Sequence, residues 1–318
     1  MTRSPRYQAV SVECVDQPLA RDLLQEAGIR AFDSVCHSDE EMLKRLQEAD
    51  TLVHFFSDRP LSLQPILQSG IKRVVVAGPG ANCFRQGRSM VPFAGFDGEI
   101  YDTPALAVRS VAEHAFCLLL MLAKNIRPTL RDMEKGAWPR AMNQELAGQT
   151  IGVIGFGAVA QTFASLCASF GMQVLVAARD TRRPDVIAQG YQFVSLPELL
   201  GKADFISLHK RLTADTQNML SESLLALMKP QAQIINTSRA ELIDTQALLR
   251  MLDKNRLAGA ALDVFEQEPL PANSRLRSHP AIIATPHNAW LTATTITRMI
   301  AGAVAAAAGN VEQVRRVH

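Results

Sequence analysis

The stretch that decides the fold is "GVIGFGAVA", residues 152–160. It places Gly155, Gly157 and Ala160 in the spacing G-x-G-x-x-A, after an apolar run typical of a buried strand and before a run with helical periodicity. The first glycine allows a tight turn, the second lets backbone N–H groups approach a pyrophosphate, and a small third residue lets the helix pack against the strand. The phosphates then lie at the helix N-terminus, where free N–H groups favour negative charge. The spacing therefore predicts a dinucleotide-binding turn, a purely structural turn being the alternative. The predicted cofactor contacts of this turn are Gly155, Gly157, Ala158 and Val159.

Strand-like and helix-like runs alternate on both sides of this turn. Before it come "YQAVSVEC", "TLVHFF" and "RVVVAGPG", and after it "MQVLVAA", "DFISLHK", "AQIINTS", "LAGAALDVF" and "AIIATPH", with helical patterns between them. Such alternation predicts βαβ units around parallel sheets. Residues 106–127 are apolar nearly all round and predict one buried helix that crosses between two domains. A last, alanine-rich helix is predicted over residues 292–311. The fold class is therefore α/β with two parallel sheets.

Composition limits the classes of partner. The chain has 318 residues, of which 47% are hydrophobic, so two domains can each bury a core. Its 33 basic and 31 acidic residues leave no broad cationic field for nucleic acid or an anionic membrane. The five cysteines include no C-x-x-C pair, and the longest apolar run is too short to span a bilayer. We expect a cytoplasmic protein with no nucleic-acid partner, no membrane partner and no metal site.

The strand after the glycine turn ends in "LVAARDTRR", residues 175–183. A dinucleotide site usually has an acid here, which binds the ribose hydroxyls of NAD and would repel the 2′-phosphate of NADP. This chain has Ala178 instead, followed by Arg179, Arg182 and Arg183, whose guanidinium groups can bind a phosphate in a bidentate manner. We therefore predict NADP rather than NAD. In the alternative interpretation Asp180 binds the ribose of NAD, and the arginines are solvated.

Reactive side chains follow three further strands. Arg239 lies in "IINTSRAELID", the acids Asp263, Glu266 and Glu268 lie in "AALDVFEQEP", and His287 lies in "IIATPHNAW". Open α/β sheets build their sites at such strand ends. An arginine can bind a carboxylate, a histidine can exchange a proton near neutral pH, and a carboxylate can orient the imidazole. Each side chain also has a structural alternative, as a surface arginine, a loop acid or a packed histidine.

These motifs, in this order, resemble those of the D-isomer-specific 2-hydroxyacid dehydrogenase family. The resemblance rests on "GVIGFGAVA", "NTSRAELID", "AGAALDVFEQEPLP" and "TPHNA", with "VAEHAF" and "LHKRLTADT" in addition, and it is weak over the first seventy residues. It implies two Rossmann-like domains. Residues 1–104 and 291–318 would form a discontinuous, flavodoxin-like substrate domain, into which a dinucleotide-binding Rossmann domain of residues 105–290 is inserted.

The resemblance also assigns roles. His287 would donate a proton to a 2-keto oxygen while NADPH delivers a hydride to the same carbon, Glu268 rather than Glu266 would partner His287, and Arg239 would hold the substrate carboxylate. Asp263 would bind the nicotinamide carboxamide. Further cofactor contacts implied by the matched motifs are Lys210, Thr237 and Ser238. The "AGPGA" loop would offer N–H groups to the substrate carboxylate through Ala77, Gly78, Pro79 and Gly80.

The implied reaction is reduction of a small 2-keto acid, of the glyoxylate or hydroxypyruvate type, to the D-2-hydroxy acid. The resemblance and the irregular connection over residues 133–149 predict a homodimer. Two alternatives stay open, namely a phosphite-type acid dehydrogenase and a non-catalytic dinucleotide-sensing regulator. The chain departs from the family at Arg211, where a proline is common, and in "ANCFR" after the glycine-rich loop. Arg85 or Arg211 could meet an extra anionic group of a substrate, or face solvent.

Overall fold

The computed structural model describes residues 9–14, 18–32, 34, 36–55, 61–77, 84–86, 89–90, 95–140, 142–179, 189–310 and 315–316. The chain divides into two compact units, one formed by Met1–Ala107 with Leu291–His318 and the other by Val108–Trp290. The boundary predicted after residue 104 falls inside the short helix η1 (Pro104–Ala107), which the division assigns to the first unit. No helix within the described ranges is long and apolar enough to cross a membrane.

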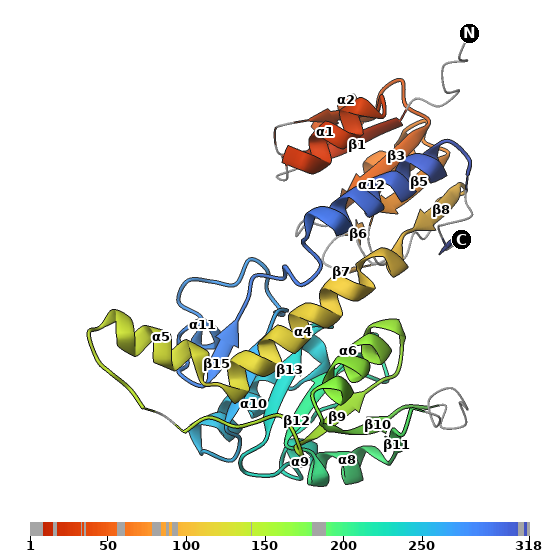
Figure 1. The fold of residues 1–318 in the computed structure, drawn as a ribbon. Helices are drawn as coiled ribbons and strands as arrows, with labels where there is room; N and C mark the ends of the chain where they lie inside the picture. The colour runs from red at the N-terminus through yellow and green to blue at the C-terminus, as the bar shows by residue number, and fades with distance from the viewer. Residues whose placement is uncertain are drawn as a thin grey trace. The chain divides into compact units, whose positions relative to one another are not determined.

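The unit Val108–Trp290 contains a seven-stranded sheet in the order β11-β10-β9-β12-β13-β14-β15, in which every pairing is parallel (Figure 1). Its strands are β9 (Thr150–Ile154), β10 (Gln173–Ala177), β11 (Gln192–Phe193), β12 (Phe205–Leu208), β13 (Gln233–Asn236), β14 (Gly259–Leu262) and β15 (Ile282–Ala284). The strand order reverses at β9, which has β10 on one side and β12 on the other. In open α/β sheets, ligands bind beyond the carboxyl ends of the strands at such a reversal.

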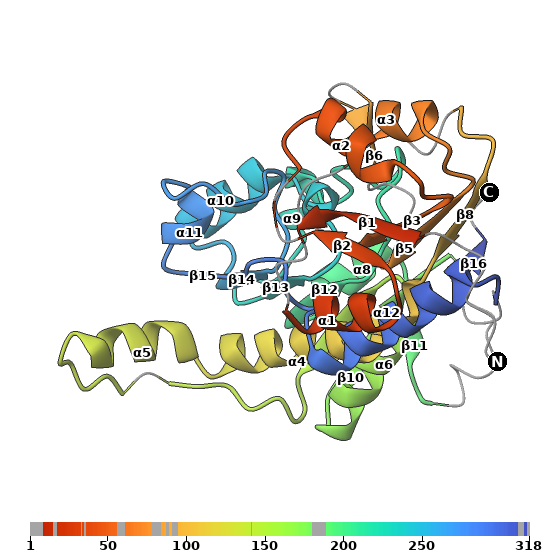
Figure 2. The same ribbon diagram turned by 90° about the horizontal axis from the view of Figure 1, so that it is seen from above.

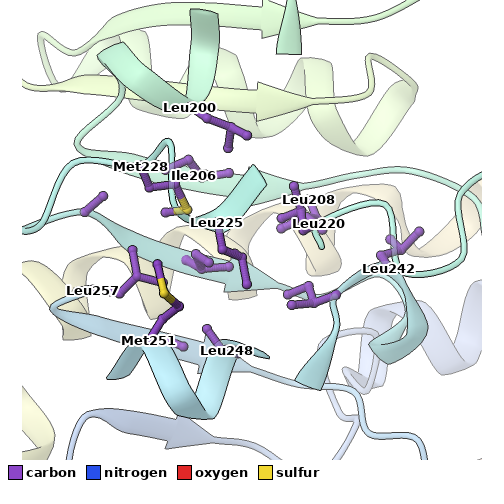
Figure 3. Packing of buried hydrophobic residues seen from close by; sticks show 14 of the residues in the cluster. Leu200, Ile206, Leu208, Leu220, Leu225, Met228, Leu242, Leu248, Met251 and Leu257 are labelled. Carbon is purple, nitrogen blue, oxygen red and sulfur yellow. The ribbon is translucent and has the colours of Figure 1, made fainter. Parts of the chain in front are cut away.

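Helices cover both faces of this sheet. They are α4 (Val108–Ala123), α6 (Ala158–Ser169), α8 (Leu196–Lys202), α9 (Glu222–Leu225), α10 (Thr245–Asp253) and α11 (Arg275–Ser278), with the short η2 (Ala240–Leu242). Side chains alternate along each strand, so Val174 and Val176 of β10 pack toward α4 and α6, while Leu175 and Ala177 belong to the core on the opposite face. Figure 3 shows that second core, where leucines and methionines of α9, α10 and nearby segments pack on β12. Burial on both faces explains why the strands are continuous apolar runs.

The unit formed by the two chain ends has its own six-stranded sheet, in the order β16-β8-β5-β3-β1-β2, with only β16 antiparallel to its neighbour. Its strands are β1 (Ala9–Cys14), β2 (Arg30–Phe32), β3 (Thr51–Phe55), β5 (Arg73–Ala77), β8 (Glu99–Asp102) and β16 (Arg315–Arg316). A small second sheet contains β4 (Leu61–Ser62), β6 (Phe84–Gln86) and β7 (Ser89–Met90). The helices are α1 (Pro18–Glu26), α2 (Asp39–Leu46), α3 (Leu63–Gln68) and α12 (Ala293–Ala307). The prediction of an α/β fold with parallel sheets is confirmed.

Helix α12 returns the C-terminal part of the chain to this unit. It packs beside α1 and on β5, as Figures 1 and 2 show. Arg73 of β5 donates hydrogen bonds to the carbonyl oxygens of Ala306 and Ala307 (3.2 and 3.1 Å), which satisfies the last turn of α12. Gly309, with φ +90°, follows the helix end, as glycines commonly do. The predicted helix over residues 292–311 is therefore shorter at its C-terminus.

The prediction of one helix over residues 106–127 is wrong. The structure has η1, then α4, which ends at Ala123, and a separate helix α5 (Ile126–Glu134) that begins after Asn125 in the left-handed region (φ 48°). The ring of Pro128 would clash with the carbonyl of Lys124 if α4 continued. Helix α5 has no buried residue, and Figures 1 and 2 show it projecting from its unit.

The packing of α8 on β9 leaves no room for a side chain at Gly152, because a β-carbon there would lie 2.4 Å from Leu199 Cδ2 and 2.8 Å from Leu199 Cγ. Leu199 is fully buried, and the same β-carbon would lie 3.1 Å from Ala203 Cβ. We expect Gly152→Ala to lower the free energy of unfolding by about 1–3 kcal/mol, measured by urea denaturation with far-UV circular dichroism. The control is Gly201→Ala on α8, where the nearest atom is 3.8 Å away and stability should stay equal or rise. Equal stability of Gly152→Ala and the parent protein would contradict the tight packing.

Candidate functional site

The turn between β9 and α6 has three small residues with different reasons for being small. Gly155 has φ +90°, and a β-carbon there would lie 2.4 Å from the carbonyl oxygen of His209 and 3.2 Å from Lys210 Cγ. Ala160 is completely buried between α6 and the sheet. A β-carbon on Gly157, the N-cap residue of α6, would meet no described atom within 4 Å. The protein's own packing therefore explains Gly155 and Ala160, while the space at Gly157 is open to a ligand at the helix N-terminus.

The end of β12 lies against this turn. Burial lowers the pKa of His209 to about 3, so its imidazole is neutral at physiological pH. Its Nε2 lies 2.9 Å from the hydroxyl of Ser207. Because His209 carries no charge, the cation at this strand end is the next residue, Lys210, which is half-buried. Arg211 after it is exposed, and its carbonyl oxygen accepts a hydrogen bond from Thr216 (2.7 Å).

The end of β10 is described as far as Arg179. Ala178 is half-buried and Arg179 is exposed, so the structure has no acid among the described residues that immediately follow this strand. Asp180, Arg182 and Arg183 lie outside the described residues. The same is true of Gly78, Pro79, Gly80 and Ala81 in the other unit, where Ala77 is the buried last residue of β5.

A hydrogen-bonded turn after β13 holds Arg239. Asn236 is almost fully buried, and its side chain accepts a hydrogen bond from Ser238 N (3.0 Å) and donates one to the carbonyl oxygen of Arg239 (2.8 Å). The hydroxyl of Ser238 donates to the carbonyl oxygen of Leu208 on β12 (2.7 Å). Arg239 is half-buried, and its Nη1 donates to the carbonyl oxygen of Ser238 (2.6 Å). The backbone that carries the guanidinium is therefore fixed.

Thr237 in the same turn has a buried hydroxyl oxygen with no hydrogen-bond partner among the described residues. Buried polar atoms nearly always have partners. Together with the open space at Gly157, this hydroxyl fits a site that a polar cofactor completes.

His287 and Glu268 form a hydrogen-bonded pair. Nδ1 of His287 lies 2.7 Å from Oε2 of Glu268, and the other carboxylate oxygen accepts a hydrogen bond from Phe265 N (2.8 Å). An ionised carboxylate only accepts hydrogen bonds, so Nδ1 is the donor and Nε2 is the nitrogen that can exchange a proton with a ligand. Glu266 instead accepts a hydrogen bond from the hydroxyl of Thr245 (2.7 Å) at the surface. The structure thus pairs Glu268, and not Glu266, with the histidine.

Asp263 is a completely buried carboxylate that binds the backbone directly after His287. It accepts hydrogen bonds from the hydroxyl of Thr285 (2.6 Å), from Asn288 N (3.1 Å) and from Ala289 N (3.0 Å). Burial by itself would raise the pKa of Asp263, but its hydrogen bonds with His114, Thr285 and Ala289 bring that pKa below its ordinary value. Asp263 is therefore ionised, and in this structure it binds the loop that contains His287. Its predicted contact with a nicotinamide carboxamide stays a prediction.

The site residues of this unit lie beyond the carboxyl ends of β9, β12, β13, β14 and β15. Sequence reasoning missed Asn236, His114 and Thr285. An asparagine at a strand end before a turn was a usable signal for the first, because asparagine side chains bind nearby backbone groups in turns. His114 lies in the "VAEHAF" motif, but no local pattern relates it to a strand end.

Comparison with known proteins agrees with this geometry. The family profile described as "D-isomer specific 2-hydroxyacid dehydrogenase, NAD binding domain" matches residues 116–289. A glyoxylate reductase of Thermococcus litoralis is 32% identical over 264 residues, which cover 77% of this chain and 76% of that protein.

Two solved structures have the same fold over nearly their whole length. The crystal structure of a protein from Thermus thermophilus is 29% identical, with a TM-score of 0.84, and the match covers 98% of this chain and 100% of that one. An acyclic imino acid reductase in complex with NADPH and D-Arg is 26% identical, with a TM-score of 0.80, and the match covers 97% of this chain and 100% of that one. The chain belongs to the D-isomer specific 2-hydroxyacid dehydrogenase family of oxidoreductases, and residues 116–289 are its NAD-binding domain.

Proposed function

We propose that the protein reduces a small 2-keto acid, of the glyoxylate or hydroxypyruvate type, to the D-2-hydroxy acid with NADPH. The observation that carries this proposal is the pairing of His287 Nδ1 with Glu268 Oε2 at 2.7 Å. That pairing supplies an oriented proton donor at a strand end of a dinucleotide-binding sheet. The 32% identity to a glyoxylate reductase supports the choice of substrate.

Three side chains act on the substrate, and each has a different role: His287, Glu268 and Arg239. The guanidinium of Arg239 binds the substrate carboxylate with two parallel hydrogen bonds. A nicotinamide cofactor, held by the turn between β9 and α6 and by Thr237, would supply the hydride for this reduction. His287 donates the proton from Nε2 to the carbonyl oxygen, and Glu268 stabilises the imidazolium before this transfer because it accepts the Nδ1 hydrogen. The products are the hydroxy acid and the oxidised cofactor.

The cofactor assignment rests on the end of β10. Ala178 removes the negative charge that would repel a 2′-phosphate, and the exposed Arg179 directly after it can bind that phosphate. The structurally similar imino acid reductase in complex with NADPH supports this assignment. Asp180, next along the chain, is the residue through which NAD would bind instead.

The segment that contains α5, Trp138 and Met142 supports a homodimer. Helix α5 exposes Leu130 and Met133, and beyond it Trp138 and Met142 are 75% and 91% exposed. Single exposed apolar residues are common, but a group of them on one projecting segment marks an interaction surface. A second copy of this chain is the partner that the family resemblance implies.

Replacement of the proton donor tests the reaction. With NADPH and a panel of glyoxylate, hydroxypyruvate, pyruvate and bulkier 2-keto acids, we expect His287→Asn to lower kcat by roughly 10²–10⁴-fold. Glu268→Gln should slow reduction, because His287 loses the carboxylate oxygen that accepts its Nδ1 hydrogen and orients its ring. Glu266→Gln is the matched control and should keep the parent rate, since Glu266 contacts Thr245 at the surface.

Equal loss in Glu266→Gln and Glu268→Gln would contradict the pairing. No turnover of any acid by the parent protein, despite binding of NADPH, would contradict the reductase and favour a dinucleotide-sensing regulator. Oxidation of phosphite with NADP⁺ in the same assay would favour the phosphite-type alternative.

Replacement of Arg179 tests the preference for NADP over NAD. We expect Arg179→Ala to weaken NADPH binding by about 10–100-fold, the loss of a hydrogen-bonded charge pair, and to leave NADH binding unchanged, measured by quenching of protein fluorescence. Arg256→Ala is the control, because Arg256 is an exposed arginine after α10. If the parent protein binds NADH as well as NADPH, or if Arg179→Ala weakens both equally, the assignment to NADP is wrong.

Introduction of charged residues on the projecting segment tests whether this segment forms the dimer interface. We expect the parent protein to sediment as a dimer and Leu130→Glu/Trp138→Glu to sediment as a monomer, because both changes place a carboxylate in the proposed apolar interface. Leu227→Glu is the control, since Leu227 is an exposed leucine (46%) outside this segment. A monomeric parent protein, or a double variant that stays dimeric, would show that this surface has another role.

A further inference from the structure

We propose that His114 of α4 is a positioning residue for the reduction and acts on His287 through Thr285 and Asp263. The inference rests on the proposed function, because it concerns the loop from which His287 gives its proton. His114 contacts neither Glu268 nor the His287 ring in the described hydrogen bonds and ion pairs.

The strand register brings Asp263 and Thr285 together beneath α4. Leu262 of β14 pairs with Ala284 of β15, so Asp263 and Thr285 are the next residues beyond that pair. Thr285 N donates to the carbonyl oxygen of Leu262 (3.0 Å), which continues the ladder. The Nε2 atom of His114 lies 3.2 Å from the hydroxyl oxygen of Thr285 and 3.5 Å from Oδ1 of Asp263.

The direction of these hydrogen bonds follows from counting protons. The ionised carboxylate of Asp263 can only accept, so the hydroxyl proton of Thr285 points to Oδ1, 2.6 Å away. A hydroxyl has one proton, so its contact with His114 must be donated by the imidazole. Nε2 of His114 therefore carries a hydrogen, and donation runs from His114 to Thr285 and from Thr285 to Asp263.

Asp263 fixes the backbone on the C-terminal side of His287, and Thr285 fixes the N-terminal side. The carboxylate accepts hydrogen bonds from Asn288 N and Ala289 N, and the carbonyl oxygen of Thr285 accepts one from His287 N (3.0 Å). His287 itself is in the left-handed region, with φ 50°. A residue other than glycine keeps that conformation only where its surroundings impose it. The position of the His287 ring thus depends on hydrogen bonds of the neighbouring backbone, which do not involve the ring itself.

His114 also helps to stabilise the buried carboxylate of Asp263. A buried carboxylate without partners is strongly unfavourable, and Nε2 of His114 lies 3.5 Å from Oδ1 of Asp263. Without the imidazole hydrogen, the Thr285 hydroxyl can rotate away and the carboxylate loses an N–H group near its Oδ1. The loop then relaxes, and the Nε2 atom of His287 moves from the carbonyl oxygen it must protonate.

Two matched pairs of variants test this role. His114→Leu removes the donor, while His114→Gln keeps an N–H group near the position of Nε2. Thr285→Val removes the hydroxyl, while Thr285→Ser keeps it. We expect His114→Leu and Thr285→Val to lower kcat on the order of 10–100-fold, as displacement of a catalytic group does. His114→Gln and Thr285→Ser should keep most of the activity, and NADPH binding and KM should change little in all four.

The double variant His114→Leu/Thr285→Val separates one pathway from two independent effects. If both residues act through the same hydrogen-bond chain, its kcat should be no lower than that of the more impaired single variant. If the fold losses in kcat of the two single variants multiply in the double variant, the hydrogen-bond chain from His114 to Thr285 is overturned.

The parent protein is assayed first, so that failure of the proposed reduction appears as no turnover before any variant is made. With an active parent, a His114→Leu variant at the parent kcat, or one no worse than His114→Gln, would overturn the inference. If thermal unfolding shows that His114→Leu does not fold, the threonine pair decides. Equal kcat for Thr285→Val and Thr285→Ser would then overturn it.

Discussion

At Gly155 the chain leaves β9 so close to the end of β12 that a β-carbon would lie 2.4 Å from the carbonyl oxygen of His209. Only glycine tolerates both this approach and φ +90°. The turn leads directly into α6, whose N-terminal N–H groups face open space at Gly157. Because β10 and β12 lie on opposite sides of β9, this is also where the strand order reverses. The nucleotide-binding half of the site thus depends on one close contact between neighbouring strands.

Two carboxylates of one loop region have opposite roles because their surroundings differ. Asp263 is fully buried, and backbone N–H groups and a hydroxyl surround it, so its charge organises the loop that follows β15. Glu268 keeps 21% of its side chain exposed and directs one oxygen to the imidazole of His287. Asp263 accepts hydrogen bonds from two backbone N–H groups of the loop after β15, whereas Glu268 accepts one from Phe265 N and uses its other oxygen to bind the imidazole. The loop is held by the first acid, and its histidine is oriented by the second.

Much of the fold, and several of the candidate site residues, could be predicted from the sequence alone. The alternation of strands and helices, the glycine turn, Arg239, His287 and the absence of an acid at Ala178 are local signals, because each depends on the backbone or side chain of a few adjacent residues. From the sequence, the choice of Glu268 over Glu266 as the partner of His287 rested on family resemblance. Both acids follow β14, and the turn between them decides which one faces His287. The end of α4 was missed because the apolar pattern continues past Ala123, whereas Pro128 prevents α4 from continuing through Lys124 and instead lies in the first turn of α5.

Only the tertiary structure decided what surrounds Asp263 and what His114 contacts. His114 and Thr285 are 171 positions apart in the chain, and they meet because α4 packs on β13 and β14 and because β15 pairs with β14. No local pattern encodes such a contact, since it arises from the register of two strands and the placement of a helix over them. The sequence therefore determined which chemical groups this protein has, and the packing of helix on sheet decided which of them act together.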